Sequence, residues 1–193
     1  MFDFPTVLCY PMSERQVREM KVRNMALCAL FAALLCVCAW ICIPVGDAAI
    51  TMQTFGIFLT LGVLGGKRGT IAIAIYLLLG CVGLPVFSGF RGGLGALMGV
   101  TGGYIAGFLV TALIYWPITT LGKNKEIFRL LGMVLGLLAC YLCGTLWFRY
   151  GYLSNGGLSW GAILLKCVVP YLLPDAAKLI LAWLLSRRLR PFA

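Results

Sequence analysis

An acidic and a basic side chain stand three residues apart within a stretch that is otherwise strongly apolar. The stretch is YLLPDAAKLILAWLL, residues 171–185, and its charged members are Asp175 and Lys178. One ionisable side chain near the middle of a bilayer costs about 2.5–3.5 kcal/mol on insertion scales. Residues i and i+3 of a helix share a face, so the two side chains can neutralise each other or hold a polar ligand beside them. A salt bridge without a ligand is the alternative interpretation.

The elements that must position this pair are membrane-spanning helices. The chain has 193 residues, 62% of them apolar and 11% charged, with a mean hydropathy of +0.98. A span needs roughly 20 apolar residues, so this length suits one domain with about six spans. We predict an all-α integral membrane protein with a single transmembrane domain over residues 1–193. The apolar runs lie near residues 24–43, 50–64, 69–82, 102–121, 128–148 and 160–186.

Basic residues orient the predicted bundle, because cytoplasmic connections collect Lys and Arg. We predict cytoplasmic termini, with a basic N-terminal segment over residues 1–23 and a basic tail over residues 187–193. The net charge of +10 then reflects topology, since nucleic-acid binding would require a basic face on a soluble fold. Twelve of the sixteen basic residues fall on the predicted cytoplasmic side: Arg15, Arg18, Lys21, Arg23, Lys67, Arg68, Lys123, Lys125, Arg129, Arg187, Arg188 and Arg190.

The first span carries a row of small residues. Its apolar run is longer than the 7–15 residues of a signal peptide, so we expect a retained helix. Ala29 and Ala33 form a small-xxx-small pair with Ala26 nearby, which permits close approach of another helix. The row serves either packing within the bundle or docking of a partner membrane protein.

Histidine is absent from the sequence, which excludes His-based acid/base chemistry and the Ser/His/Asp arrangement. The nine cysteines are scattered, mostly through the spans, and are expected to behave as small apolar residues. We therefore predict no catalytic residues, no metal site and no cofactor.

A glycine-rich segment precedes the fourth span. Nine of the 24 glycines lie between Gly83 and Gly107, interspersed with large apolar residues that can pack. We predict an outer loop over residues 83–101 whose backbone turns freely and approaches a ligand closely. Arg91 lies at its centre, suited to bind a carboxylate through two hydrogen bonds. A solvated loop arginine is the alternative.

Two prolines interrupt the last span, at Pro170 and Pro174. Proline is favoured at the first position of a helix, and an acidic residue is favoured in the first turn. The sequence LPDAAK therefore predicts a new helix that begins near Pro174, with Asp175 and Lys178 facing the bundle interior.

Four motifs together resemble the BioY family, the biotin-binding S-components of energy-coupling factor (ECF) transporters. The motifs are TMQTFG (51–56), YLLLGCVGLPVFSG (76–89), GGLGALMGVTGGYIAGF (92–108) and PDAAKLILA (174–182). One departure is Val100, where the family usually has proline. The resemblance implies six helices in a cell membrane of a prokaryote, with biotin bound near the outer face. It also implies two kinds of partner, a transmembrane coupling protein and two cytoplasmic ATPases.

The chemistry of biotin suggests a role for each candidate residue. We expect Asp175 to accept a ureido N–H, Lys178 to donate to the ureido carbonyl or the carboxylate, and Arg91 to hold the valerate tail. Other expected ligand contacts come from loop residues, aromatic rings and polar side chains: Ser88, Gly89, Phe87, Leu94, Tyr104, Tyr76, Gln53 and Thr101.

Two other functions stay open. The chain could be an S-component or carrier for another small vitamin, which ligand competition would distinguish. It could also be a membrane-embedded enzyme that modifies a lipid, although such chemistry usually requires more carboxylates or a metal. The chain lacks the phosphate-binding GxxxxGK[ST] pattern, so we expect ATP hydrolysis to belong to partners.

Overall fold

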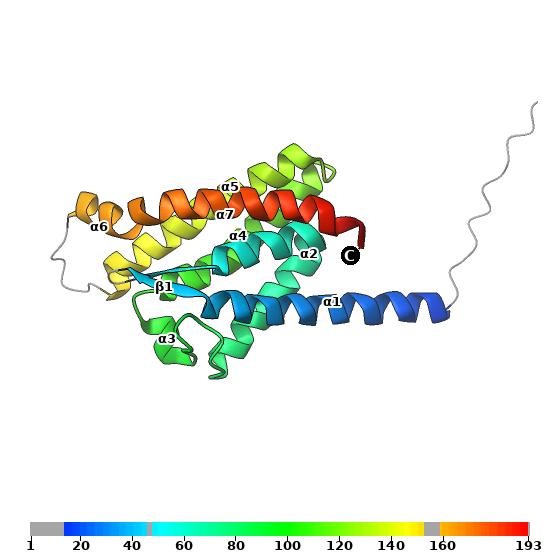
Figure 1. Ribbon diagram of the computed structural model, residues 1–193, viewed down its shortest axis with the longest axis horizontal. Helices are drawn as coiled ribbons and strands as arrows, with labels where there is room; N and C mark the ends of the chain where they lie inside the picture. Colours follow the sequence, from blue (N-terminus) through cyan, green and yellow to red (C-terminus); the bar gives the residue numbers. More distant parts are fainter. Residues whose placement is uncertain (1–13, 46–47, 153–158, 193) are drawn as a thin grey trace, which may run out of the picture.

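The structure is a computed structural model that describes residues 14–45, 48–152 and 159–192 (Figure 1). Long helices lie side by side, and a β-hairpin and a short helix cover one end of the bundle. The elements are α1 (Glu14–Trp40), β1 (Cys42–Val45), β2 (Ala48–Thr51), α2 (Gln53–Cys81), α3 (Leu94–Met98), α4 (Gly102–Leu121), α5 (Glu126–Trp147), a π-helical turn η1 (Phe148–Tyr152), α6 (Trp160–Cys167), α7 (Val169–Leu189) and a 3₁₀ turn η2 (Arg190–Phe192).

The helix labelled α2 contains two of the predicted spans. Gly65 has φ 78° and ψ 177°, which is not helical, and the chain turns back on itself there (Figure 1). A Cβ added to Gly69 would lie 3.1 Å from the Cα of Leu61, whereas eight residues of straight helix span about 12 Å. The predicted spans 50–64 and 69–82 are therefore two segments joined by one glycine.

Five helical stretches in the described residues are long and apolar enough to cross a membrane. Because α2 folds back at Gly65, it supplies two crossings. The crossings are α1, the two halves of α2, α4, α5, and α6 together with α7. The predicted all-α membrane architecture is confirmed.

Small residues and short polar side chains bring the helices together. Helix α2 packs against α1, α4 and α7, and α4 packs along α5. Where α4 meets α5, a Cβ on Gly107 would lie 2.9 Å from Cys140 Sγ. Nearby, the hydroxyl of Thr111 donates to the carbonyl of Gly136 at 2.8 Å. Such close contacts are what hold helices together in a membrane, where lipid is as apolar as the side chains.

The start of α1 and the end of the chain lie at the same end of the bundle (Figure 1). The guanidinium of Arg23 donates to the carbonyl of Phe192 at 2.9 Å, and Arg68 donates to Asn24 at 2.9 Å. We call this the basic end. Residues 14–23 of the predicted N-terminal segment form the first turns of α1, whereas residues 1–13 lie outside the described residues.

Two arginines at the basic end form hydrogen bonds beside the reversal of α2 at Gly65. Gly62 lies in the last turn before Gly65, where helix carbonyls lose their intrahelical partners. Its carbonyl accepts from Arg129 at 3.3 Å and from Arg190 at 3.2 Å. Arg190 also pairs with Glu126, so the reversal of α2, the start of α5 and η2 are joined at the basic end.

The break in the last span lies earlier than predicted. α6 ends at Cys167, and the backbone leaves the helical conformation at Val168, with φ −123° and ψ −53°. Pro170 takes the first turn of α7, where its missing N–H costs nothing. Pro174 lies inside α7, so the prediction of a helix start there was wrong. Asp175 is consequently in the second turn and not in the first.

Candidate ligand-binding site

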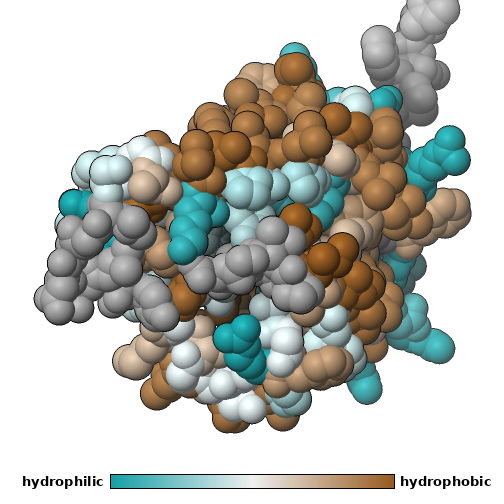
Figure 2. All heavy atoms as spheres, turned by 60° about the vertical axis from the view of Figure 1, so that its left-hand side comes forward, coloured by the Kyte–Doolittle hydropathy of each residue, from teal (hydrophilic) through white to brown (hydrophobic). Residues whose placement is uncertain are grey.

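A cavity of about 70 Å³ opens at the end of the bundle opposite the basic end. One ordered water needs about 10–15 Å³ by the same measure, so the cavity has room for several waters or part of a small molecule. Figure 2 looks toward this end, where pale and teal residues interrupt the brown surface of the sides. The lining residues are Ile50, Thr51, Gln53, Thr54, Ser88, Thr101, Tyr104, Ile105, Phe108, Leu137, Cys140, Tyr141, Tyr171, Asp175 and Lys178.

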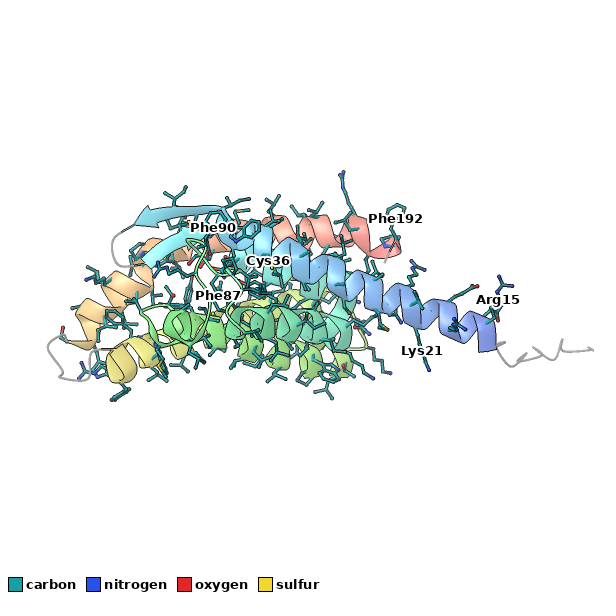
Figure 3. The ribbon with its side chains drawn as sticks, turned by 90° about the horizontal axis from the view of Figure 1, so that it is seen from below. Arg15, Lys21, Cys36, Phe87, Phe90 and Phe192 are labelled. Atoms are coloured by element: carbon teal, nitrogen blue, oxygen red, sulfur yellow. The ribbon has the colours of Figure 1, made fainter. Side chains whose placement is uncertain are left out.

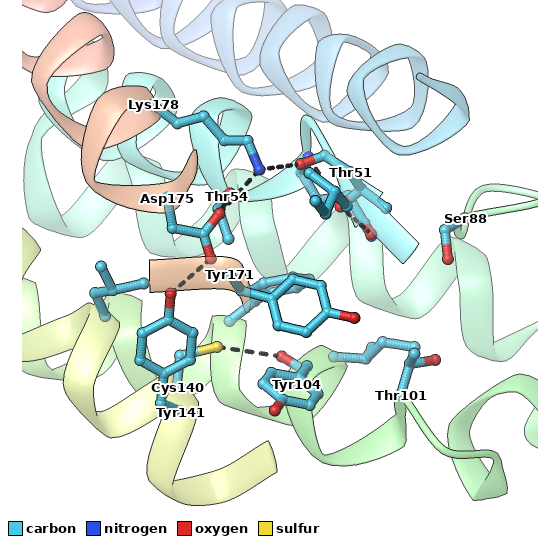
Figure 4. A pocket seen from close by; sticks show the side chains of 15 residues that line it. Thr51, Thr54, Ser88, Thr101, Tyr104, Cys140, Tyr141, Tyr171, Asp175 and Lys178 are labelled. Atoms are coloured by element: carbon cyan, nitrogen blue, oxygen red, sulfur yellow. Dashed lines mark hydrogen bonds and ion pairs between the residues drawn. The ribbon is translucent and has the colours of Figure 1, made fainter. Parts of the chain in front are cut away.

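The carboxylate of Asp175 is the most heavily bonded group in the lining (Figure 4). Oδ1 accepts from the ammonium of Lys178 at 2.9 Å and from the hydroxyl of Thr54 at 2.9 Å. Oδ2 accepts from the hydroxyl of Tyr141 at 2.8 Å. A buried carboxylate requires such partners, because an unpaired charge in an apolar interior is very costly. The donors come from three elements, α2, α5 and α7, which meet at this residue.

The ammonium of Lys178 lies between two acceptors. It donates to Asp175 and to the backbone carbonyl of Thr51, at the end of β2, at 2.7 Å. The side chains of Lys178 and Asp175 are only 11% and 8% exposed, so the pair contributes a buried but neutral unit. Their contact follows from their i, i+3 spacing on α7, as the sequence predicts.

A second polar chain leads from the cavity to the glycine-rich loop. The hydroxyl of Thr51 donates to the amide oxygen of Gln53 at 3.1 Å. The amide nitrogen of Gln53 donates to the hydroxyl of Tyr76 at 2.7 Å, and that hydroxyl donates to the carbonyl of Val86 at 3.1 Å. Gln53 is therefore held in one orientation at the cavity wall.

Aromatic and apolar side chains form the rest of the wall. Tyr104, Phe108 and Tyr171 come from α4 and α7 and line the cavity with Leu137. The hydroxyl of Tyr104 donates to the carbonyl of Cys167 at 2.7 Å, which fixes the ring against the junction of α6 and α7. Together with the Asp175 network, this wall suits a ligand with one polar end and an apolar ring.

The structure brings six of the predicted ligand contacts together in the lining: Asp175, Lys178, Gln53, Ser88, Thr101 and Tyr104. The others do not line the cavity. Phe87 is buried against Tyr76, and Arg91 and Leu94 are exposed on the loop. Gly89 lies in the same loop, one residue beyond Ser88. Whether these loop residues contact a ligand stays a prediction.

Sequence reasoning missed Thr54 and Tyr141, which donate to Asp175, and Tyr171, which lines the cavity. Thr54 follows Gln53 directly in the TMQTFG motif, so a signal was present. Tyr141 lies in a span without any polar pattern near it, and its pairing with Asp175 depends on how α5 packs beside α7. No signal in the sequence could have found that contact.

Two other predictions concern sites away from the cavity. Ala26, Ala29 and Ala33 are all exposed on α1, so within the described bundle they do not serve internal packing. In the described ranges, no group of three Cys, Asp or Glu side chains is arranged to hold a metal ion.

Comparisons with known proteins agree on one family. A model of the BioY family matches residues 12–193. The biotin transporter BioY of Thermotoga maritima is 40% identical over 172 residues, which cover 88% of this chain and 96% of that protein. The probable biotin transporter BioY of Pyrococcus horikoshii is 37% identical over 171 residues, with 89% and 98% covered. The crystal structure of an S-component for biotin from an ECF-type ABC transporter has a TM-score of 0.81 and 28% identity, covering 94% of this chain and 95% of that one.

Proposed function

The chain belongs to the BioY family, and from that premise we propose that it is the biotin-binding substrate-specificity subunit of an ECF-type transporter. It would act in the cell membrane of a prokaryote and would itself catalyse no reaction. The observation that carries the proposal is the Asp175 network at the wall of an outer-end cavity. The names of its relatives, which are biotin transporters, support the choice of ligand.

Unused hydrogen-bonding capacity at the pair matches the ureido ring of biotin. A carboxylate oxygen accepts up to two hydrogen bonds, and an ammonium donates three. Oδ1 of Asp175 already accepts two, whereas Oδ2 accepts only one. Lys178 uses two of its three hydrogens. A ureido N–H can therefore bind Oδ2, and the ureido carbonyl can accept the third hydrogen of Lys178.

The neutrality of the pair gives the ligand an orientation. Asp175 and Lys178 cancel each other's charge, so the anionic carboxylate of biotin gains little by binding there. The thioether ring would pack against Tyr104, Phe108 and Tyr171. The valerate tail would then point out of the cavity past Ser88, where Gly89 and Arg91 could bind its carboxylate from the loop.

Delivery of biotin requires partners in this proposal. A transmembrane coupling protein would bind the exposed Ala26, Ala29 and Ala33 face of α1, and two cytoplasmic ATPases would drive transport. The basic end would face the cytoplasm, because Lys and Arg are retained on that side during insertion. No cofactor or metal is required for binding.

Calorimetric titration of biotin into the purified protein tests this function. We expect tight binding by the wild type and loss of at least tenfold in affinity for Asp175→Asn and for Lys178→Met, since a hydrogen bond to a charged group is worth about 1.5–3 kcal/mol. Lys67→Met removes an exposed lysine at the basic end and is the matched control. A folded wild type that binds another vitamin and not biotin would refute the choice of ligand.

A further inference from the structure

A tight turn in the glycine-rich loop forms part of the cavity wall. The backbone N–H of Phe87 donates to the carbonyl of Arg91 at 2.9 Å and closes the turn. The ring of Phe87 is buried edge-on against Tyr76, with centroids 5.7 Å apart and planes at 88°. Ser88, inside the turn, lines the cavity. The 87–91 turn is thus attached to the core of the bundle through the buried ring of Phe87.

The backbone of this turn is strained at Phe90. Phe90 has φ 56° and follows Gly89, which has φ 69°. The left-handed conformation is readily adopted by glycine but is an outlier for a bulky aromatic residue. The ring of Phe90 is not buried in compensation, since the residue is 64% exposed. Strain of this kind persists where surrounding contacts impose it, so the contact that holds Phe90 matters.

That contact is Trp40, the last residue of α1. Its ring stacks on Phe90, with centroids 5.2 Å apart and planes at 24°. Its indole N–H donates to the carbonyl of Pro85 at 2.8 Å. Trp40 therefore contacts the loop both before and after Phe87, at Pro85 and at Phe90. Figure 3 shows Phe90 at the end of α1 and Phe87 beneath it.

We propose that Trp40 is a positioning residue that holds the 87–91 turn at the mouth of the cavity, so that the ligand enters and leaves when the Trp40–Phe90 stack parts. The identity of that ligand rests on the proposed function. Trp40 lies seven residues after Ala33, which is two helical turns, so both face the same side of α1. A coupling protein docked along this face would reach the contact that closes the cavity.

Exchange kinetics of labelled biotin test this role. In Trp40→Ala we expect association and dissociation both to accelerate by about tenfold, the factor that one aromatic pair is worth, while Kd changes much less. Trp40→Phe keeps the stack without the indole hydrogen bond and should restore most of the slow exchange. Trp116→Ala, on α4, is the matched control, because Trp116 is 38% exposed and Trp40 is 39% exposed. Unchanged rates in Trp40→Ala would overturn the proposal.

Hydrogen exchange in the ligand-free protein gives a second readout that does not depend on biotin. The Phe87 amide should exchange about tenfold faster in Trp40→Ala than in wild type and Trp116→Ala, if the stack keeps the turn closed. Equal protection in all three proteins would show that Trp40 does not hold the turn. A wild type that fails to bind biotin would instead contradict the proposed function, and the exchange comparison would still decide the role of Trp40.

Discussion

Tyr141 on α5 donates its hydroxyl hydrogen to Oδ2 of Asp175 on α7 at 2.8 Å, inside the bundle. The two residues are 34 positions apart in the sequence, and both are at least nine-tenths buried. This bond restricts the orientation of the carboxylate and leaves Oδ2 the capacity to accept one further hydrogen bond.

Tyr141→Phe should weaken biotin binding by roughly tenfold or more, because a hydrogen bond to a charged group contributes about 1.5–3 kcal/mol. Titration calorimetry of the purified variant measures the loss. Tyr115→Phe is the control, since Tyr115 is also buried but does not line the cavity. Equal affinity for wild type and Tyr141→Phe would mean that Asp175 is oriented without this bond.

Gly65→Ala should lower the free energy of unfolding by about 1–3 kcal/mol, because the backbone at Gly65, with φ 78° and ψ 177°, lies in a region that essentially only glycine adopts. The added Cβ would meet no described atom within 4 Å, so the loss comes from the backbone alone. Thermal unfolding in detergent measures it. Gly95→Ala also adds a Cβ in open space, but at ordinary φ, and should leave the unfolding midpoint unchanged or higher. Similar midpoints for the two variants would argue against the reversal at Gly65.

Arg129→Met should destabilise the basic end without weakening biotin binding. Arg129 donates to the carbonyls of Gly62 and Asn124, and both bonds would be lost, at a cost of about 1.5–3 kcal/mol for a hydrogen bond to a charged group. The unfolding midpoint and the calorimetric Kd together test this prediction. Arg188→Met, an exposed arginine at the same end, should change neither quantity. Loss of biotin affinity in folded Arg129→Met would show that the two ends are coupled.

Ala29→Trp or Ala33→Trp should abolish copurification of the coupling protein and ATPases, because a large side chain prevents close helix approach. Biotin binding by the isolated variant should persist, since neither Ala29 nor Ala33 lines the cavity. Ala106→Trp places the same side chain on an exposed position of α4 and should retain the complex. Complex formation by Ala29→Trp would move the docking surface elsewhere.

Local patterns in the sequence were enough to predict the membrane-spanning helices and the central ion pair of this protein. Composition and the lengths of the apolar runs predicted six crossings, including the two short ones that meet at Gly65. The i, i+3 spacing alone was enough to predict that Asp175 and Lys178 pair, because a helix repeats every 3.6 residues wherever it is placed.

Tertiary structure decided what local patterns could not. Both prolines of the last span can begin a helix, and the choice of Pro170 over Pro174 depends on where α6 and α7 pack. Thr54 and Tyr141 reach Asp175 only because α2, α5 and α7 converge on it. Arg91 lies outside the cavity lining because Phe87 and Trp40 fix the loop. Such contacts join residues that are far apart in the chain, so the periodicity and spacing of the sequence cannot predict them.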